Sequence, residues 1–536
     1  MQAVEFTGDE AALLSRYFTN LDRPVFALRN LPEVVKGALF SRYSRTEKSL
    51  RRVLLEEFIN DPESGFHGIA GAPGTDDMVA VRRAEEFYER VLVGYGDDSV
   101  AELAGAHMAV ERTSTLAAKA LEDSRIGISP LEKSTRYVRF DRPGADGRRL
   151  YYRGPELAHP AYEPAADALF DAYSSLLEPV TTSIRDRFPI EAGETERAWK
   201  SATRAKAFDL LRGLLPAGTL TNLGLFGNGR AFEYLITKMA AHELPECQGL
   251  AVDLHRELEQ VIPAFVKRAL DDKYGRPAAE RMEQVRKALQ KMSSRTLSRA
   301  ARSAAEGTPT GPQVRLVGHD PDAERKVVQA ALFPYSDRSL EDQHADPDAV
   351  LDAMFAGRAN RRQRVPRALE HAQYKFEIVA NFAAYRDLHR HRMLTQERQL
   401  LGTSLGYDVP AGLAELGMEP QFRAAVEAAG AAHADLERDL GPALAQYVVP
   451  LAFRVRWYFR VNLRELYHLC ELRTTPQGHP DYRWVAQEMF RLAAEVHPRL
   501  TRFAAFVDMG PGDELERRKA ERRLDEKLQT LERPVQ

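Results

Sequence analysis

Hydrophobic residues recur at three- and four-residue intervals along residues 370–398, the spacing of one face of an α-helix. We therefore predict a single amphipathic helix for this stretch. The triplet Arg390-His391-Arg392 lies near its expected C-terminal end. The hydrophobic positions that define the face are Tyr374, Phe376, Ile378, Val379, Phe382, Ala383, Tyr385 and Leu388.

A hydrophobic run followed by a helical pattern occurs twice in the chain. Residues 24–28 and 314–317 have the composition of strands, and helical patterns follow them at 35–44 and 328–336. The similarity continues downstream, where residues 214–216 match 448–450 and residues 228–230 match 462–464. Self-similarity at such a long period predicts a duplicated domain rather than a solenoid.

The length and the repeat together predict the domain organisation. A chain of 536 residues is too long for one hydrophobic core. We expect one domain over residues 1–292 and a second over 313–536, joined by a surface linker at 293–312 that is rich in Ser, Arg, Ala, Gly and Thr. Residues 151–196 look like a helical insertion, and the charge-dense tail from 513 to 536 is predicted to be a solvated helix.

The composition of the chain argues against several classes of protein. A net charge of -3 argues against a general nucleic-acid-binding protein. Two cysteines, Cys247 and Cys470, are too few for a disulfide framework, and no metal site is predicted. The N-terminal residues do not resemble a signal peptide, and no hydrophobic run reaches the length of a bilayer span. We expect a cytoplasmic protein without membrane partners.

The triplet Arg390-His391-Arg392 is the first candidate site. Adjacent cationic side chains repel one another, and an anion such as a phosphate group would neutralise them. The alternative is a solvated basic helix end that interacts favourably with the helix dipole.

The triplet and a second motif resemble the flavin-dependent thymidylate synthases, whose signature combines Arg-His-Arg with Glu-x-Ser-x-Arg-Tyr. The second half of the chain has the triplet but carries Leu400 where the family has Ser, whereas the first half has Glu132-Lys133-Ser134-Thr135-Arg136-Tyr137 without the triplet. Downstream, Arg212 of the first half corresponds to Gln446, and Arg473 of the second half corresponds to Met239. Each half retains what the other has lost.

The resemblance implies an α+β fold with two tandem domains of this family, each a mixed β-sheet packed with helices. It also implies reductive methylation of deoxyuridine monophosphate (dUMP) to thymidylate, with FAD as cofactor and with methylenetetrahydrofolate and NAD(P)H as further substrates. Because family members assemble as homotetramers, we expect a homodimer of this chain that forms a pseudo-tetramer.

The family's site residues are carried over to this chain as one composite site. The implied catalytic residues are Arg473, Arg390 and Ser134. The implied nucleotide-binding residues are Glu132, Ser134, Thr135, Arg136, Arg212, Arg390 and Arg473. The implied flavin-binding residues are Glu370, Arg390, His391, Arg392, Asn462 and His479.

Two other functions fit parts of the sequence. Asp387, Leu400 and Gln446 depart from the family pattern and favour a flavin- or nucleotide-binding pseudoenzyme with a regulatory role. A purely structural helical protein is the third hypothesis. Asp387 itself is interpreted as a surface acid, and Cys470 as a buried, unreactive thiol.

Overall fold

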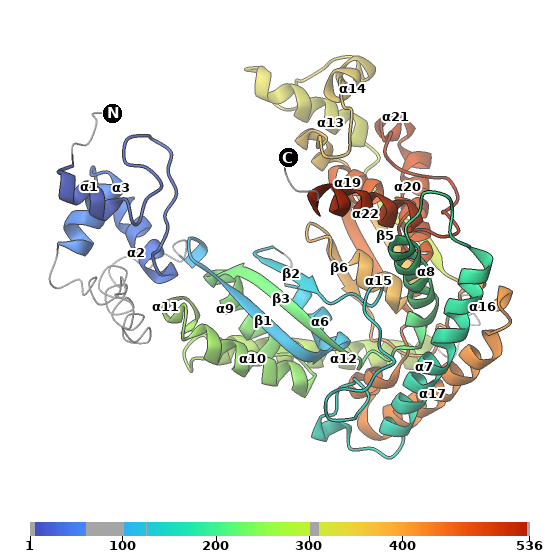
Figure 1. Ribbon diagram of the computed structural model, residues 1–536. Helices are drawn as coiled ribbons and strands as arrows, with labels where there is room; N and C mark the ends of the chain where they lie inside the picture. Colours follow the sequence, from blue (N-terminus) through green and yellow to red (C-terminus); the bar gives the residue numbers. More distant parts are fainter. Residues whose placement is uncertain (1–5, 45, 61–100, 125, 301–309, 533–536) are drawn as a thin grey trace. The chain divides into compact units, whose positions relative to one another are not determined.

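The computed structural model describes residues 6–44, 46–60, 101–124, 126–300 and 310–532. The chain forms two compact units. The smaller unit comprises residues 1–111, 120–132 and 222–303, and the larger unit comprises 112–119, 133–221 and 304–536. Each unit combines helices with a β-sheet, so the mixed helix-and-sheet class is confirmed (Figure 1).

A four-stranded antiparallel sheet forms the centre of the larger unit. Its strand order is β4 (Gln313–His319), β5 (Gln373–Asn381), β7 (Arg454–Asn462) and β6 (Thr395–Arg398). The predicted strand at 314–317 is thus confirmed as part of β4, and the helix predicted after it is α13 (Ala323–Leu332). Trp457 and Phe459 on β7 are buried.

The single helix predicted over residues 370–398 is wrong. The structure has β5 there, then the short helix α15 (Phe382–Leu388), and then β6. Tyr374, Phe376 and Ile378 alternate along β5 and are buried, while Val379 and Ala380 are buried as well. A strand covered on both faces has hydrophobic residues at consecutive positions, and over a short stretch these also match a helical spacing.

Asparagine residues begin the two helices that follow the central strands. Asn381 ends β5, and its side chain accepts a hydrogen bond from the backbone N–H of Ala384 in α15. Asn462 ends β7 and does the same for Glu465 in α19 (Leu463–Arg473). Asparagine is a favoured N-cap because its side chain satisfies a backbone N–H that the helix leaves free.

Long helices surround this sheet. Helix α20 (Pro480–Val496) packs on β4 and β5, and α7 (Tyr162–Arg187) contacts both α8 (Glu196–Leu211) and α17 (Glu419–Leu440). The C-terminal helix α22 (Arg518–Glu532) packs on α8. The tail thus forms the predicted helix, but one face of it packs on α8 instead of being solvated. Asp525 of α22 is buried and accepts hydrogen bonds from Thr195 and Arg197.

The smaller unit contains a three-stranded sheet in the order β1 (Gly105–Ser114), β3 (Leu220–Asn228) and β2 (Ile128–Glu132). Helix α9 (Gly229–Ala240) contacts α10 (Pro245–Leu258), α11 (Pro263–Val266) and α12 (Gly275–Ala300). Near the N-terminus lie α1 (Gly8–Leu14), α2 (Glu33–Tyr43) and α3 (Leu50–Val53).

One local prediction for this part of the chain is wrong, one is confirmed, and the predicted linker stays a prediction. Residues 24–28 form no strand and contribute only one isolated bridge, between Leu28 and Phe18. The predicted helix at 35–44 is confirmed as α2. Helix α12 continues to Ala300, so the first residues of the predicted linker are helical. Residues 301–309 lie outside the described part of the chain.

Two of the similar segments in the two halves, residues 214–216 and 448–450, pair with each other inside the larger unit. Pro216 and Pro450 form an antiparallel bridge. The N–H of Ala217 donates to the carbonyl of Val449, and the N–H of Leu451 donates to the carbonyl of Leu215, both at 2.9 Å. The pairing is nearly symmetric, as a contact between two copies of the same element should be.

The compact units do not follow the two sequence halves. Residues 133–221 belong to the first half of the sequence but pack with the second half. The division at 293–312 remains a prediction about the duplication in the sequence. Among the described residues, no helix combines the length and hydrophobicity needed to cross a bilayer.

Candidate functional site

Asp387 is the centre of a cluster of arginines in the larger unit. It lies in the last turn of α15, and its Oδ2 accepts a hydrogen bond from Nη1 of Arg212 at 2.9 Å. Burial would raise the pKa of Asp387, but the guanidiniums of Arg212, Arg390, Arg136 and Arg473 hold it well below its usual range. Asp387 is therefore ionised and is not the surface acid that the sequence analysis assumed.

Arg136 is held by a second carboxylate. Its Nε and Nη2 donate to the two carboxylate oxygens of Asp209 at 2.7 and 2.6 Å, and both residues are buried. Burial would raise the pKa of Asp209, but Arg136 lowers it to about 2. This bidentate geometry fixes the plane of the Arg136 guanidinium. Asp209 belongs to α8, which follows the predicted insertion in the sequence.

Arg212 has hydrogen-bond donors that no described protein group accepts. Its side chain is buried, and its Nε and Nη2 have no hydrogen-bond partner among the described residues. A buried donor without a partner costs free energy, so a polar ligand at this position would be favoured.

His391 connects Arg473 to the core of the larger unit. Nε of Arg473 donates to Nε2 of His391 at 3.0 Å, and Nδ1 of His391 lies 2.8 Å from Oε1 of Glu465. Because Nε2 accepts, the proton of the neutral imidazole is on Nδ1 and is donated to Glu465. Burial, together with Arg473 and His389, keeps the pKa of His391 well below its ordinary value. His391 therefore positions Arg473 as a neutral acceptor.

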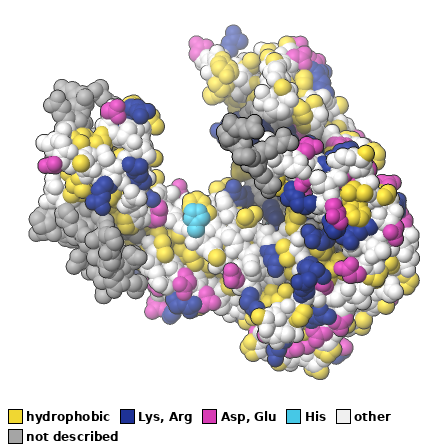
Figure 2. Space-filling model, in the orientation of Figure 1, with side chains coloured by type: hydrophobic (Ala, Val, Ile, Leu, Met, Phe, Trp, Pro, Cys, Tyr) yellow, Lys and Arg dark blue, Asp and Glu magenta, His cyan; other side chains and the backbone are white. Residues whose placement is uncertain are grey.

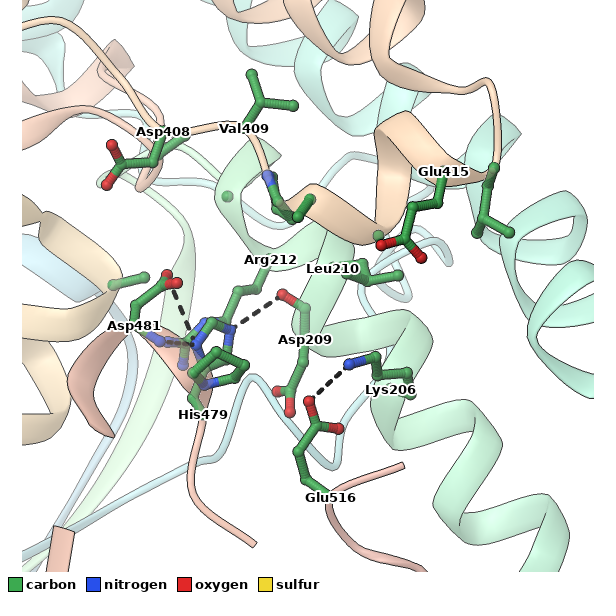
Figure 3. A pocket seen from close by; sticks show the side chains of 18 of the residues that line it. Lys206, Asp209, Leu210, Arg212, Asp408, Val409, Glu415, His479, Asp481 and Glu516 are labelled. Carbon is green, nitrogen blue, oxygen red and sulfur yellow. Dashed lines mark hydrogen bonds and ion pairs between the residues drawn. The ribbon is translucent and has the colours of Figure 1, made fainter. Parts of the chain in front are cut away.

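A cavity of about 360 Å³ lies against Arg212, Asp209 and His479 (Figure 3). Nε2 of His479 lies 3.3 Å from the carbonyl oxygen of Asp209, and Nδ1 accepts from the N–H of Asp481. Burial and the nearby Arg212 lower the pKa of His479 to about 4, so the ring is neutral and carries its proton on Nε2. Lys206 and Glu516 form an ion pair at 2.6 Å on the same cavity wall.

The structure divides the predicted flavin residues between two places. Glu370 and Asn462 line a separate cavity of about 40 Å³, and His479 is not brought to them. Glu370 is paired with Arg464 at 3.1 Å, and the side chain of Asn462 is used as a helix cap. Arg392 is exposed, whereas His391 is buried.

The residues of the first-half motif are placed in the larger unit, except for one. The hydroxyl of Ser134 accepts a hydrogen bond from the backbone N–H of Arg136 at 3.1 Å, and Thr135 is buried. Glu132 ends β2 and belongs to the smaller unit, where it is buried. The structure thus brings Arg136, Arg212, Arg390 and Arg473 together around Asp387, and Ser134 contacts the backbone of Arg136.

One group of possible metal ligands was not foreseen. His391, Glu465 and His468 each offer a ligand atom within 4.8 Å of the others, the one such group within the described ranges. Burial lowers the pKa of His468, and the nearby His391, Arg364 and Arg361 lower it further. This positive potential opposes a metal cation.

Asp209 and Asp387 are the functional residues that sequence analysis missed or misassigned. Asp387 stands one helical turn before Arg390, and residues at that spacing lie on the same face of a helix. The spacing could therefore have indicated that the two side chains are neighbours. Asp209 lies far along the chain from Arg136, and no sequence pattern links the two.

On the surface, Lys and Arg are interspersed with Asp and Glu over the visible face of each unit (Figure 2).

Comparisons with known proteins agree with the duplicated motifs. A family model described as "Thymidylate synthase complementing protein" matches residues 52–264 and again 315–499. A UPF0159 protein of Chlamydia pneumoniae is 45% identical over 94% of this chain and 95% of its own length. A flavin-dependent thymidylate synthase of Geobacter sulfurreducens is 29% identical over 37% of this chain and 88% of its own length.

Among solved structures, a UMP/dUMP methylase, PolB, from Streptomyces cacaoi matches with a TM-score of 0.31 and 19% identity. The match covers 36% of this chain and 93% of that chain.

Proposed function

The chain belongs to the Thy1 family of thymidylate synthase complementing proteins, as a duplicated and partly degenerate member, and from this we propose that it is a flavin-dependent thymidylate synthase. The proposed reaction is the reductive methylation of dUMP, with methylenetetrahydrofolate as the one-carbon donor and NAD(P)H as the reductant. The observation that carries the proposal is the convergence of four arginines on Asp387 inside one unit of one chain.

The charges of this cluster suit a nucleoside monophosphate. The four guanidiniums of Arg136, Arg212, Arg390 and Arg473 are opposed by the carboxylates of Asp209 and Asp387. Two positive charges remain, and a phosphate monoester near neutral pH carries about two negative charges. The free N–H groups of Arg212 supply hydrogen-bond donors of the kind that bind phosphate oxygens.

Arg473 has the role of stabilising charge on the pyrimidine. It is held by His391 on one side and lies 5.6 Å from the ring centroid of Tyr482. A guanidinium fixed before the reaction stabilises negative charge that develops on a base without further reorganisation. No cysteine nucleophile takes part in this proposal. Cys470 is fully buried and donates to the carbonyl of Ala486, and burial raises the pKa of its thiol.

The donors near the triplet fit a flavin dinucleotide. Arg361 and Arg364 line the cavity that contains Asn462, and both are exposed, as is Arg392. Cationic side chains on an accessible wall suit a diphosphate. In the proposal Arg361, Arg364 and Arg392 hold the FAD diphosphate, and Glu370 keeps Arg464 in place. Bound FAD would supply the hydride equivalent of the reaction.

The test is complementation of a strain that requires thymidine. We expect rescue by the wild-type chain and none by Arg390→Ala or Ser134→Ala. The matched control is Arg460→Ala, because Arg460 is exposed on β7 and should rescue like the wild type. Rescue by both site variants would refute the assigned roles.

The alternative function is a nucleotide-binding pseudoenzyme. The observation that favours it is the bidentate Arg136–Asp209 pair, which occupies the motif arginine internally. A purified protein that binds dUMP but shows no flavin absorption band, even after incubation with FAD, would support this alternative. A yellow protein whose band bleaches on reduction would support the synthase.

A further inference from the structure

A fifth arginine faces the proposed nucleotide site from the C-terminal tail. Arg517 lies just before α22, beyond residue 499, where the family match ends. A cavity of about 220 Å³ is lined by Arg136, Arg473 and Arg517, together with the rings of Tyr137 and Tyr482. All of these residues belong to the larger unit.

Arg517 is buried without a protein partner for two of its nitrogens. Its exposed fraction is 7%, and its Nε and Nη1 have no hydrogen-bond partner within the described residues. Its guanidinium carbon lies 4.0 Å from the ring centroid of Tyr137, which packs against the cation but accepts no conventional hydrogen bond. Burying a charge in this way is costly unless something pairs with it.

The neighbouring carboxylates do not remove this cost. Glu516 is paired with Lys206 at 2.6 Å, and Asp209 is used by Arg136. Glu521 is the one acidic residue that lines the cavity, against three arginines. The cavity therefore keeps an excess of positive charge beside unsatisfied N–H groups.

The tail is fixed in this position by its own contacts. Arg518 pairs with Glu194 at 2.9 Å, and Thr195 donates to Asp525 at 2.6 Å. These contacts tie both ends of the first two turns of α22 to the start of α8. Arg517 is thus presented by a docked helix and not by a free chain end.

We propose that Arg517, together with Arg136, binds the phosphate group in this cavity, which Arg473 also lines. The ligand class is a phosphate monoester dianion, and the inference rests on the proposed function in taking the nucleotide to be dUMP. The tail is then a part of the binding site that neither repeat encodes.

The experiment measures the affinity of wild type, Arg517→Gln and Arg523→Gln for dUMP, deoxyuridine and inorganic phosphate by calorimetry. Arg523 is the matched control because it is an exposed arginine of the same helix. We expect Arg517→Gln to weaken dUMP binding about 10- to 100-fold, the usual effect of losing a charged hydrogen bond, and to leave deoxyuridine binding unchanged. Arg523→Gln should bind like the wild type.

The melting temperature without ligand separates a binding role from a structural one. Removing an unpaired buried charge should leave the melting temperature of Arg517→Gln equal to or above that of the wild type, and phosphate should raise it less than in the wild type. A melting temperature of Arg517→Gln below that of the wild type without ligand would overturn the inference. So would an equal loss of affinity for dUMP and for deoxyuridine in this variant.

The phosphate titration also separates the two proposals. If the wild type binds phosphate through Arg517 but does not bind dUMP, the proposed function fails and the anion site stands. If dUMP binds equally to wild type and Arg517→Gln, the inference fails and the proposed function stands. A wild type that binds neither ligand would refute both.

Discussion

Asp387 lies among guanidiniums that would otherwise repel one another. Arg212 contacts it directly, and Arg390, Arg136 and Arg473 act on it through space. A carboxylate at this position lets several cations share a small volume before any ligand arrives. The same carboxylate competes with an incoming phosphate for those cations, so stability and affinity are opposed at this residue.

Replacing Asp387 with Asn should separate these two effects. Breaking a buried ion pair typically costs about 3–5 kcal/mol, so the free energy of unfolding should fall on that order in Asp387→Asn. Inorganic phosphate should then raise the unfolding midpoint more in the variant than in the wild type. The measurement is urea unfolding with and without phosphate.

The control for this prediction lies in the smaller unit. Glu233→Gln breaks the pair of Glu233 with Arg268, whose atoms are 2.9 Å apart, and should give no phosphate-dependent difference from the wild type. A stability of Asp387→Asn equal to that of the wild type in phosphate-free buffer would contradict the role assigned to Asp387.

At the scale of elements, strand β7 with helix α19 repeats strand β3 with helix α9. In each case the last residue of the strand is an asparagine that caps the helix, Asn228 in the first half and Asn462 in the second. The capping hydrogen bonds measure 2.8 and 2.9 Å. The two halves of the sequence therefore share this local folding signal, although their charged residues differ.

This pair of caps gives a matched test of the flavin site. Asn462→Ala and Asn228→Ala should each cost about 0.5–2 kcal/mol of stability, because each leaves a helix N-terminus without its acceptor. Asn462→Ala should also reduce the flavin absorbance of the purified protein, and Asn228→Ala should not. Equal flavin content in the two variants would remove Asn462 from the proposed flavin site.

At the scale of the whole molecule, the two halves of the sequence share one compact unit. Residues 213–218 of the first half pair with residues 447–452 of the second through backbone hydrogen bonds. The charged residues that survive in the two halves lie around the same carboxylate. Arginines from both halves of the sequence thus act on one carboxylate within a single compact unit.

The predicted assembly is a homodimer, since two tandem chains supply the four copies of a family tetramer. Light scattering coupled to gel filtration should give twice the chain mass of 60.3 kDa. A particle with the mass of one chain, at concentrations where activity is present, would contradict the pseudo-tetramer.

The sequence by itself determined the family, and it supplied the motifs from which the duplication and the cationic site residues were predicted. These follow from local order along the chain, as in Arg390-His391-Arg392 or Ser134-Thr135-Arg136. The strand before α15 was predicted as a helix, because its alternation ends at Ile378 and the buried residues that follow at consecutive positions also match a helical spacing.

Tertiary structure alone decided which charges meet. Asp209 reaches Arg136 from helix α8, the half-buried Asp387 is surrounded by arginines from both halves, and Arg517 enters from the tail. The strength of an ion pair depends on distance and burial in three dimensions, and neither is encoded in the spacing of residues along the chain.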